Sequence, residues 1–236
     1  MYNESGTGYF EDDFVRQHRA SRVVTGVFVW MLLGLMISAL TAIIAVSVPA
    51  IYTAIFRSGY GYMVLVIATL VMVIAVFPRV YKMSAAAGFA TFIIYAIING
   101  LMLSSIFLIY NLGQISLAFF SAAAMFGIMA IYGAITKSDL TTKGRMLMMG
   151  LSGIIVATIL NLFFRSSTLD LVISYVAIAV FLGLTAYDTQ RIKTMAYEVP
   201  DDRSVRTLMI LGALSLYLDF INLFLRLLRL LGRRGR

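Results

Sequence analysis

The sequence predicts an all-α membrane protein, a bundle of seven transmembrane helices. The first observation is composition: 61% of the 236 residues are hydrophobic and 13% are charged, which a soluble domain of this size does not reach. The second is length, because the apolar segments have the roughly 20 residues that a helix needs to cross the hydrocarbon core. The third is that lysine and arginine gather in short clusters between these segments, a pattern typical of membrane orientation.

The seven predicted spans follow one another with short connectors. They cover roughly residues 23–47, 62–77, 86–110, 115–136, 146–164, 170–190 and 207–231. We therefore divide the chain into a polar N-terminal tail (1–22), a membrane domain (23–231) and a basic C-terminal tail (232–236). The polar tail does not resemble a cleaved signal peptide, so we expect the first span to be retained. The absence of cysteine excludes a disulfide framework and a thiolate metal site.

The positive charges predict the direction in which the chain crosses. The N-terminal tail and the connectors after spans two, four and six carry twelve lysines and arginines, whereas the opposite connectors carry two, Arg57 and Arg165. Because positive segments stay in the cytoplasm, we expect a cytoplasmic N-terminus and, after seven crossings, an external C-terminus. Five arginines near the C-terminus oppose that last crossing, but the earlier connectors outweigh them. The formal net charge of +8 therefore reflects orientation and not nucleic-acid binding.

A polar stripe runs along the last predicted span. Asp219 lies near its middle, with Gly212 and Ser215 seven and four residues before it, and Asn222 and Arg226 three and seven residues after it. These positions share one side of a helix. A carboxylate at the centre of a membrane helix costs about 2.5–3.5 kcal/mol on insertion scales, so it tends to face a cavity or a partner. The structural alternative is that the stripe forms hydrogen bonds between helices.

Asp188 is the expected partner of Asp219. It belongs to the motif "LTAYDTQRIK" at the end of the sixth span, and the polar turn "EVPDDRS" separates the two aspartates. The midpoint between them falls on this turn. If the last two spans form an antiparallel hairpin, both carboxylates lie at about the same depth, roughly 22 Å from the turn at 1.5 Å per residue. The sequence therefore predicts a pair of acids inside the membrane.

The motifs "AYDTQRIK" and "ALSLYLDFINLFLRLLRLLG" resemble the C-terminal signature of the transmembrane Bax inhibitor motif family (Bax inhibitor-1-like proteins), in its bacterial type. The resemblance implies a seven-helix bundle with the last helix central, and a paired-aspartate pH sensor that controls a calcium leak. The pair maps onto Asp188 and Asp219. In a bacterial member an arginine at the end of the second span pairs with the first aspartate, and Arg79 in "VFPRVYK" occupies a matching position. Arg79 is thus a candidate latch on the acid pair.

Other kinds of chemistry find little support. Residues 207–231 contain no lysine for a retinal Schiff base, and the single histidine, His18, lies in the N-terminal tail. "YLD" lacks the glycines of an intramembrane aspartyl protease, so we expect no enzyme activity and no cofactor. Asn99, in the middle of the third span, is a further candidate for lining the cavity, together with Ser215, Asn222 and Arg226.

The expected function is a pH-regulated cation leak, for Ca²⁺, in the cytoplasmic (inner) membrane of a bacterium. Its partners are then the lipid bilayer, Ca²⁺ and protons, with Asp188 and Asp219 as a weak, transient Ca²⁺ site. One alternative is a non-conducting regulator that binds a membrane protease or other membrane proteins. Another is an exchanger that couples protons to cations through the same acid pair.

Overall fold

The computed structural model describes residues 5–199 and 201–233, and within these ranges the chain folds into helices without any strand. The element bounds are α1 Ser5–Ser47, α2 Pro49–Tyr52, η1 Thr53–Arg57, α3 Gly61–Val71, η2 Met72–Val76, η3 Phe77–Lys82, α4 Ala85–Leu103, α5 Ile106–Ile109, α6 Leu112–Ile135, α7 Thr141–Phe164, α8 Ser167–Glu198 and α9 Asp202–Arg233.

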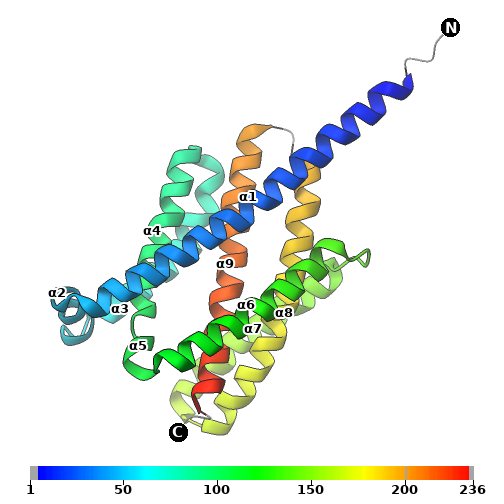
Figure 1. Cartoon of the computed structure of the whole chain (residues 1–236). Coiled ribbons are helices and arrows are strands. Elements are labelled where there is room, and N and C mark those ends of the chain that lie inside the picture. Colours follow the sequence, from blue (N-terminus) through cyan, green and yellow to red (C-terminus); the bar gives the residue numbers. More distant parts are fainter. Residues whose placement is uncertain (1–4, 200, 234–236) are drawn as a thin grey trace.

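Seven of the helical segments are long and apolar enough to cross a membrane, which confirms the predicted all-α membrane fold. They are His18–Ser47, Gly61–Val80, Ala85–Ile109, Leu112–Ile135, Thr141–Phe164, Ser167–Glu198 and Arg203–Gly232. Neighbouring segments are joined by short connections, so consecutive spans run in alternating directions (Figure 1).

The ends of the predicted spans differ from the observed helices. Helix α1 begins at Ser5 and has 43 residues, so most of the predicted polar tail continues the first span as one helix. At 1.5 Å per residue this helix is about 65 Å long, which is twice the thickness of the hydrocarbon core. Its N-terminal part extends past the other helices (Figure 1). Most of the predicted C-terminal tail, 234–236, lies outside the described residues.

The second span is irregular and does not end before Pro78 as predicted. Helix α3 passes into the π-helical turn η2 and then into the 3₁₀-helix η3, where Pro78 lies in the first turn. Proline is tolerated there because the first residues of a helix need no N–H donor for an intrahelical bond. The helical path therefore continues to Lys82, and Arg79 belongs to the 3₁₀-helix.

Helix α9 is the most buried span. Of the 18 most apolar consecutive residues of this span, 67% are buried, against 6% for the corresponding residues of α7. Helix α9 packs against α1, α4, α6 and α8. Figure 1 shows it in orange to red, passing between α4 and α8. Its apolar side chains Leu216, Leu223 and Leu228 are almost fully buried. The polar stripe of this helix is thus carried into the protein interior.

Two glycines hold neighbouring helices in close backbone contact. A Cβ atom on Gly100 of α4 would lie 2.6 Å from the carbonyl oxygen of Ser38 on α1. A Cβ on Gly133 of α6 would collide with the backbone of Ala186 on α8, two residues before Asp188. Larger residues cannot be accommodated at these contacts without moving the helices apart, so the contacts fix α8 and its aspartate against α6.

Candidate functional site

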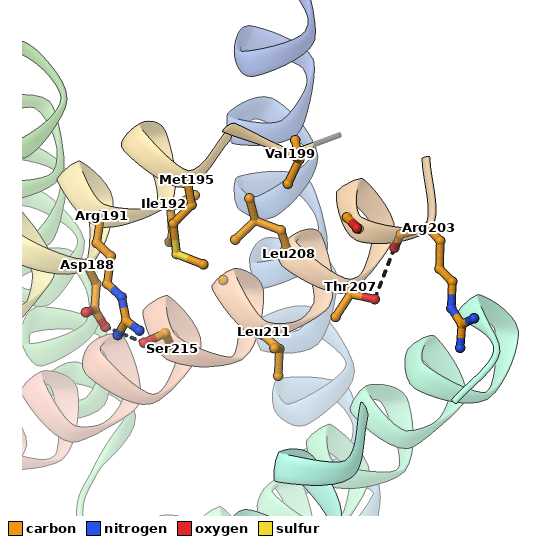
Figure 2. A pocket seen from close by; sticks show the side chains of 12 residues that line it. Asp188, Arg191, Ile192, Met195, Val199, Arg203, Thr207, Leu208, Leu211 and Ser215 are labelled. Carbon is orange, nitrogen blue, oxygen red and sulfur yellow. Dashed lines mark hydrogen bonds between the residues drawn. The ribbon is translucent and has the colours of Figure 1, made fainter. Parts of the chain in front are cut away.

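Asp188 is held on α8 by a hydrogen bond from α9. The hydroxyl of Ser215 donates to Asp188 Oδ2, and the two side chains lie at one end of a pocket between the two helices (Figure 2). Arg191, three residues further along α8, lies beside Asp188 and Ser215, and its positive charge attracts the Asp188 carboxylate. Positions three residues apart share a helix face, so the sequence spacing already places Arg191 beside Asp188.

Asp219 lies one turn further along α9. Its side chain is only 5% exposed, and its Oδ2 atom has no hydrogen-bond partner among the described residues. Because Ser215 and Asp219 are four residues apart, their Cβ atoms lie about 5–6 Å from each other on one face. Asp188, bonded to Ser215, is therefore about one helical turn from Asp219 along the axis, not at the same depth. The structure brings the two predicted acids together with this offset.

The pocket has a volume of about 500 Å³ and extends from Asp188 towards the α8–α9 turn. Its walls are apolar side chains of both helices, among them Ile192, Met195, Leu208 and Leu211. Arg203 and Thr207 line the end that is farther from Asp188 (Figure 2). The pocket therefore connects a partly buried carboxylate with the turn end of the bundle, by which we mean the end that holds the α8–α9 turn.

The remaining members of the stripe lie beyond Asp219. The Asn222 amide donates to the Leu218 carbonyl of its own helix at 2.8 Å. Arg226 is partly buried: its Nη2 lies 3.5 Å from the Thr158 hydroxyl of α7, and its Nη1 is buried without a partner among the described residues. None of these residues lines the pocket that contains Asp188.

Asn99 and Arg79 lie apart from the acid pair. Asn99 is buried on α4 and donates to the Tyr95 hydroxyl at 3.3 Å, and it does not line the pocket. The Arg79 side chain is exposed and donates to the Ala75 carbonyl in its own span. Within the part of the chain that is described, Arg79 and Asp188 form no ion pair.

A second polar contact of α9, which the sequence did not indicate, lies on the side of the helix away from Asp219 and involves Tyr217. The Tyr217 and Ser38 hydroxyls are 2.7 Å apart, and Ser38 donates to the Ala96 carbonyl of α4 at 2.7 Å. The Tyr217 ring packs edge-on against Phe92 and Tyr95. This contact joins α1, α4 and α9. The sequence gives no specific signal for this contact, because Ser38 and Tyr217 are single polar side chains on apolar helices, 179 positions apart in the chain.

The site can offer few ligands to a metal ion. The residues that the structure describes contain no group of three or more histidine, cysteine, aspartate or glutamate side chains able to hold one. Asp188, Asp219 and the Ser215 hydroxyl supply oxygen ligands, which suit a hard cation such as Ca²⁺. Because Ca²⁺ takes six to eight oxygens, most of its shell here would remain water.

These features define a class: a polytopic membrane protein built around a buried acid pair on its last two spans. The family of inhibitors of apoptosis-promoting Bax1 matches residues 20–236. YbhL of Escherichia coli (strain K12), described as an inner membrane protein, is 42% identical over 210 residues, which cover 88% of this chain and 90% of that protein.

Two further relatives match over a similar length. A protein of Borreliella burgdorferi (strain ATCC 35210) is 41% identical over 215 residues, covering 91% of this chain and 93% of the relative. The protein RP147 of Rickettsia prowazekii is 40% identical over 213 residues, covering 90% of each chain. The chain belongs to the Bax inhibitor-1 family of membrane proteins.

Proposed function

We propose that this protein is a transport protein, a pH-regulated leak for Ca²⁺ in the inner membrane of a bacterium, with Asp188 and Asp219 as its sensor. The observation that supports the proposal most is Asp219 itself, which is 5% exposed and has an unpartnered oxygen one turn from a second carboxylate. A buried acid without partners destabilises a membrane protein, so its presence in the interior is best explained by a function. The inner-membrane location is proposed from the relative YbhL of Escherichia coli, an inner membrane protein.

Protons and Ca²⁺ compete for the same oxygens in this proposal. Two carboxylates held close together do not both ionise easily, so they share a proton and titrate as a unit. Protonation removes the negative charge at the inner end of the pocket. Full deprotonation creates a negative site that attracts Ca²⁺, and the small number of protein ligands favours passage over storage.

The turn end of the bundle is proposed to face the cytoplasm. The twelve lysines and arginines of the N-terminal tail and of the connectors after spans two, four and six all belong to this end, against Arg57, Arg165 and the five arginines near the C-terminus at the other. A reporter fused after Ser5 is expected to behave as cytoplasmic and one fused after Gly235 as external. A cytoplasmic reporter at Gly235 would show that the last span does not cross completely.

Purified protein in liposomes that contain a calcium dye tests the function. The proposal expects Ca²⁺ entry that requires the protein and changes with pH. Entry that requires an opposing proton gradient, with matched proton efflux, would instead identify an exchanger.

A non-conducting regulator is the second candidate, and the extension of α1 past the bundle favours it, because a helix outside the membrane domain offers a surface to another membrane protein such as a protease. A correctly folded protein that carries no Ca²⁺ at any pH would favour the regulator and contradict the leak.

A further inference from the structure

Two buried side-chain atoms lack a hydrogen-bond partner among the described residues, and both belong to the same face of α9. They are Asp219 Oδ2, an acceptor, and Arg226 Nη1, a donor. Seven residues separate them, which is two helical turns or about 10.5 Å along the axis. Buried polar groups are nearly always paired, so each unpaired group calls for an explanation. The acid pair explains the first atom, and the proposed function does not yet use the second.

The surroundings of Arg226 leave it with excess positive charge. One turn further along α9, Arg229 forms an ion pair with Asp170 of α8 at 2.6 Å. Arg226 itself donates to the neutral Thr158 hydroxyl at 3.5 Å, and beyond that contact it is under the influence of the charges of Asp170 and Arg229. Among the side chains that are described, the Asp170 carboxylate is therefore shared by two guanidinium groups at this end of the α8–α9 pair, which we name the Asp170 end.

The ordinary role of an arginine near the end of a membrane helix is to extend towards the lipid headgroups and anchor the helix. Such an anchor places its guanidinium in water. Arg226 instead buries Nη1 between α9 and its neighbours, on the stripe that carries Asp219. Arg229, which is half exposed and paired, fits the anchor role better.

We propose that Arg226 is the electrostatic barrier that limits cation passage between the acid pair and the Asp170 end. This inference rests on the proposed leak. A cation that leaves the acid pair along the stripe must pass the Arg226 guanidinium, whose counter-charge Asp170 is shared with Arg229. On the other side of the pair, Arg191 lines the pocket beside Asp188. The two acids thus lie between two arginines, an arrangement that admits cations but keeps their passage slow.

The valence of the ion separates a charge barrier from a loosened structure. Coulomb repulsion is proportional to the charge of the ion, so it slows a divalent cation by the square of the factor for a monovalent one. Arg226→Met removes the charge and keeps an apolar stem of similar length. For this variant we expect about a tenfold rise in Ca²⁺ flux and about a threefold rise in Tl⁺ flux in liposomes.

Two matched variants complete the experiment. Arg226→Lys keeps the positive charge, so its fluxes should stay within about twofold of wild type if charge is what matters. Arg57→Gln removes an exposed cation from the connector after α1, away from the stripe, and should leave both fluxes unchanged. Thermal unfolding of the purified proteins checks that each variant folds, and Arg226→Gln, which can still donate to Thr158, replaces Arg226→Met if that variant does not.

Several results would overturn the barrier. Equal increases for Ca²⁺ and Tl⁺ would show loosened packing, and a Lys variant as leaky as the Met variant would show that charge is not the cause. A wild type that leaks with pH dependence and an unchanged Arg226→Met variant would remove the barrier but leave the leak. If neither protein carries Ca²⁺, the leak and the barrier both fail. A silent wild type with a conducting Arg226→Met variant would support the barrier.

Discussion

Tyr217 and Asp219 are two residues apart on α9 and face nearly opposite sides of it, about 200° around the axis. The Tyr217 hydroxyl meets Ser38, whose own hydroxyl also reaches the Ala96 carbonyl, and no atom of this contact is left unpaired among the described residues. The Asp219 carboxylate has a bare oxygen and lies one turn from Asp188. Both side chains are buried to a similar degree, 0% and 5% exposed.

The difference teaches how to separate structural from functional polar groups inside a membrane bundle. A buried hydroxyl with its partners in place contributes to helix packing. A buried acid without them has no such gain, so its presence points to a ligand or a proton that comes and goes. Burial alone would have ranked Tyr217 above Asp219, whereas hydrogen bonding separates them.

The largest expected effect tests the Asp219 face. Asp219→Asn and Asp188→Asn each keep the side-chain shape and remove one member of the titrating pair, so the ratio of Ca²⁺ flux at acidic and neutral pH should become about one. The melting temperature should not fall in either variant, because the carboxylate that remains no longer has a second acid beside it.

The exposed Asp139 in the α6–α7 connection supplies the control for these variants. The Thr141 hydroxyl and backbone N–H both donate to its carboxylate, and this lowers the pKa of Asp139. Asp139→Asn should leave the pH profile as in wild type. Wild-type pH dependence in both acid-pair variants would end the idea that the Asp219 face senses protons.

The next largest effect tests whether Arg79 contacts the acid pair in another conformation of the protein. Here Arg79 bonds to Ala75, but an arginine that latches an ionised Asp188 would hold the second span in place. We expect Arg79→Ala to raise the flux several-fold and to weaken its pH dependence, measured in the same liposomes. Lys82→Ala, an exposed cation of the same 3₁₀-helix, is the control. An Arg79→Ala profile identical to wild type would leave Arg79 as a membrane anchor.

The smallest effect tests the Tyr217 face. Tyr217→Phe removes one hydroxyl and leaves Ser38 bonded to Ala96, so the free energy of unfolding should fall by about 1 kcal/mol. The pH profile of the flux should not change. Tyr175→Phe, on the exposed surface of α8, should alter neither stability nor flux. A changed pH profile in Tyr217→Phe would mean that the two faces of α9 are coupled and that the comparison is too simple.

The sequence predicts the seven spans well because hydropathy reports directly on membrane crossing. It does not predict that α1 starts at Ser5, since a polar helix outside the membrane leaves no hydropathy signal. Helical counting places Asp188 and Asp219 on neighbouring helices. The error of one turn arises because α8 ends at Glu198 and α9 begins at Asp202, so the turn lies before the midpoint of the two aspartates at 203–204.

The position of Arg79 could not be counted in the same way. The second span contains a π-helical turn, η2, followed by a 3₁₀-helix, η3, and both change the number of residues per turn. Counting with 3.6 residues per turn therefore cannot predict which side of the second span carries Arg79. Arg191, by contrast, lies on a regular helix three residues after Asp188, and the same counting that found the acid pair would have found it.

The charges on α9 also determine when this helix can become part of the membrane. Asp219, near the middle of the span, carries an insertion cost of about 2.5–3.5 kcal/mol for a lone helix, and Arg226, nearer the end, adds a smaller one. Contacts with α1, α4, α6 and α8 remove most of α9 from lipid, and all four precede it in the chain. Stable insertion of α9 therefore depends on the earlier spans, which must already be assembled. The first consequence of a substitution that separates α1 from α4 would be that α9 fails to insert into the membrane.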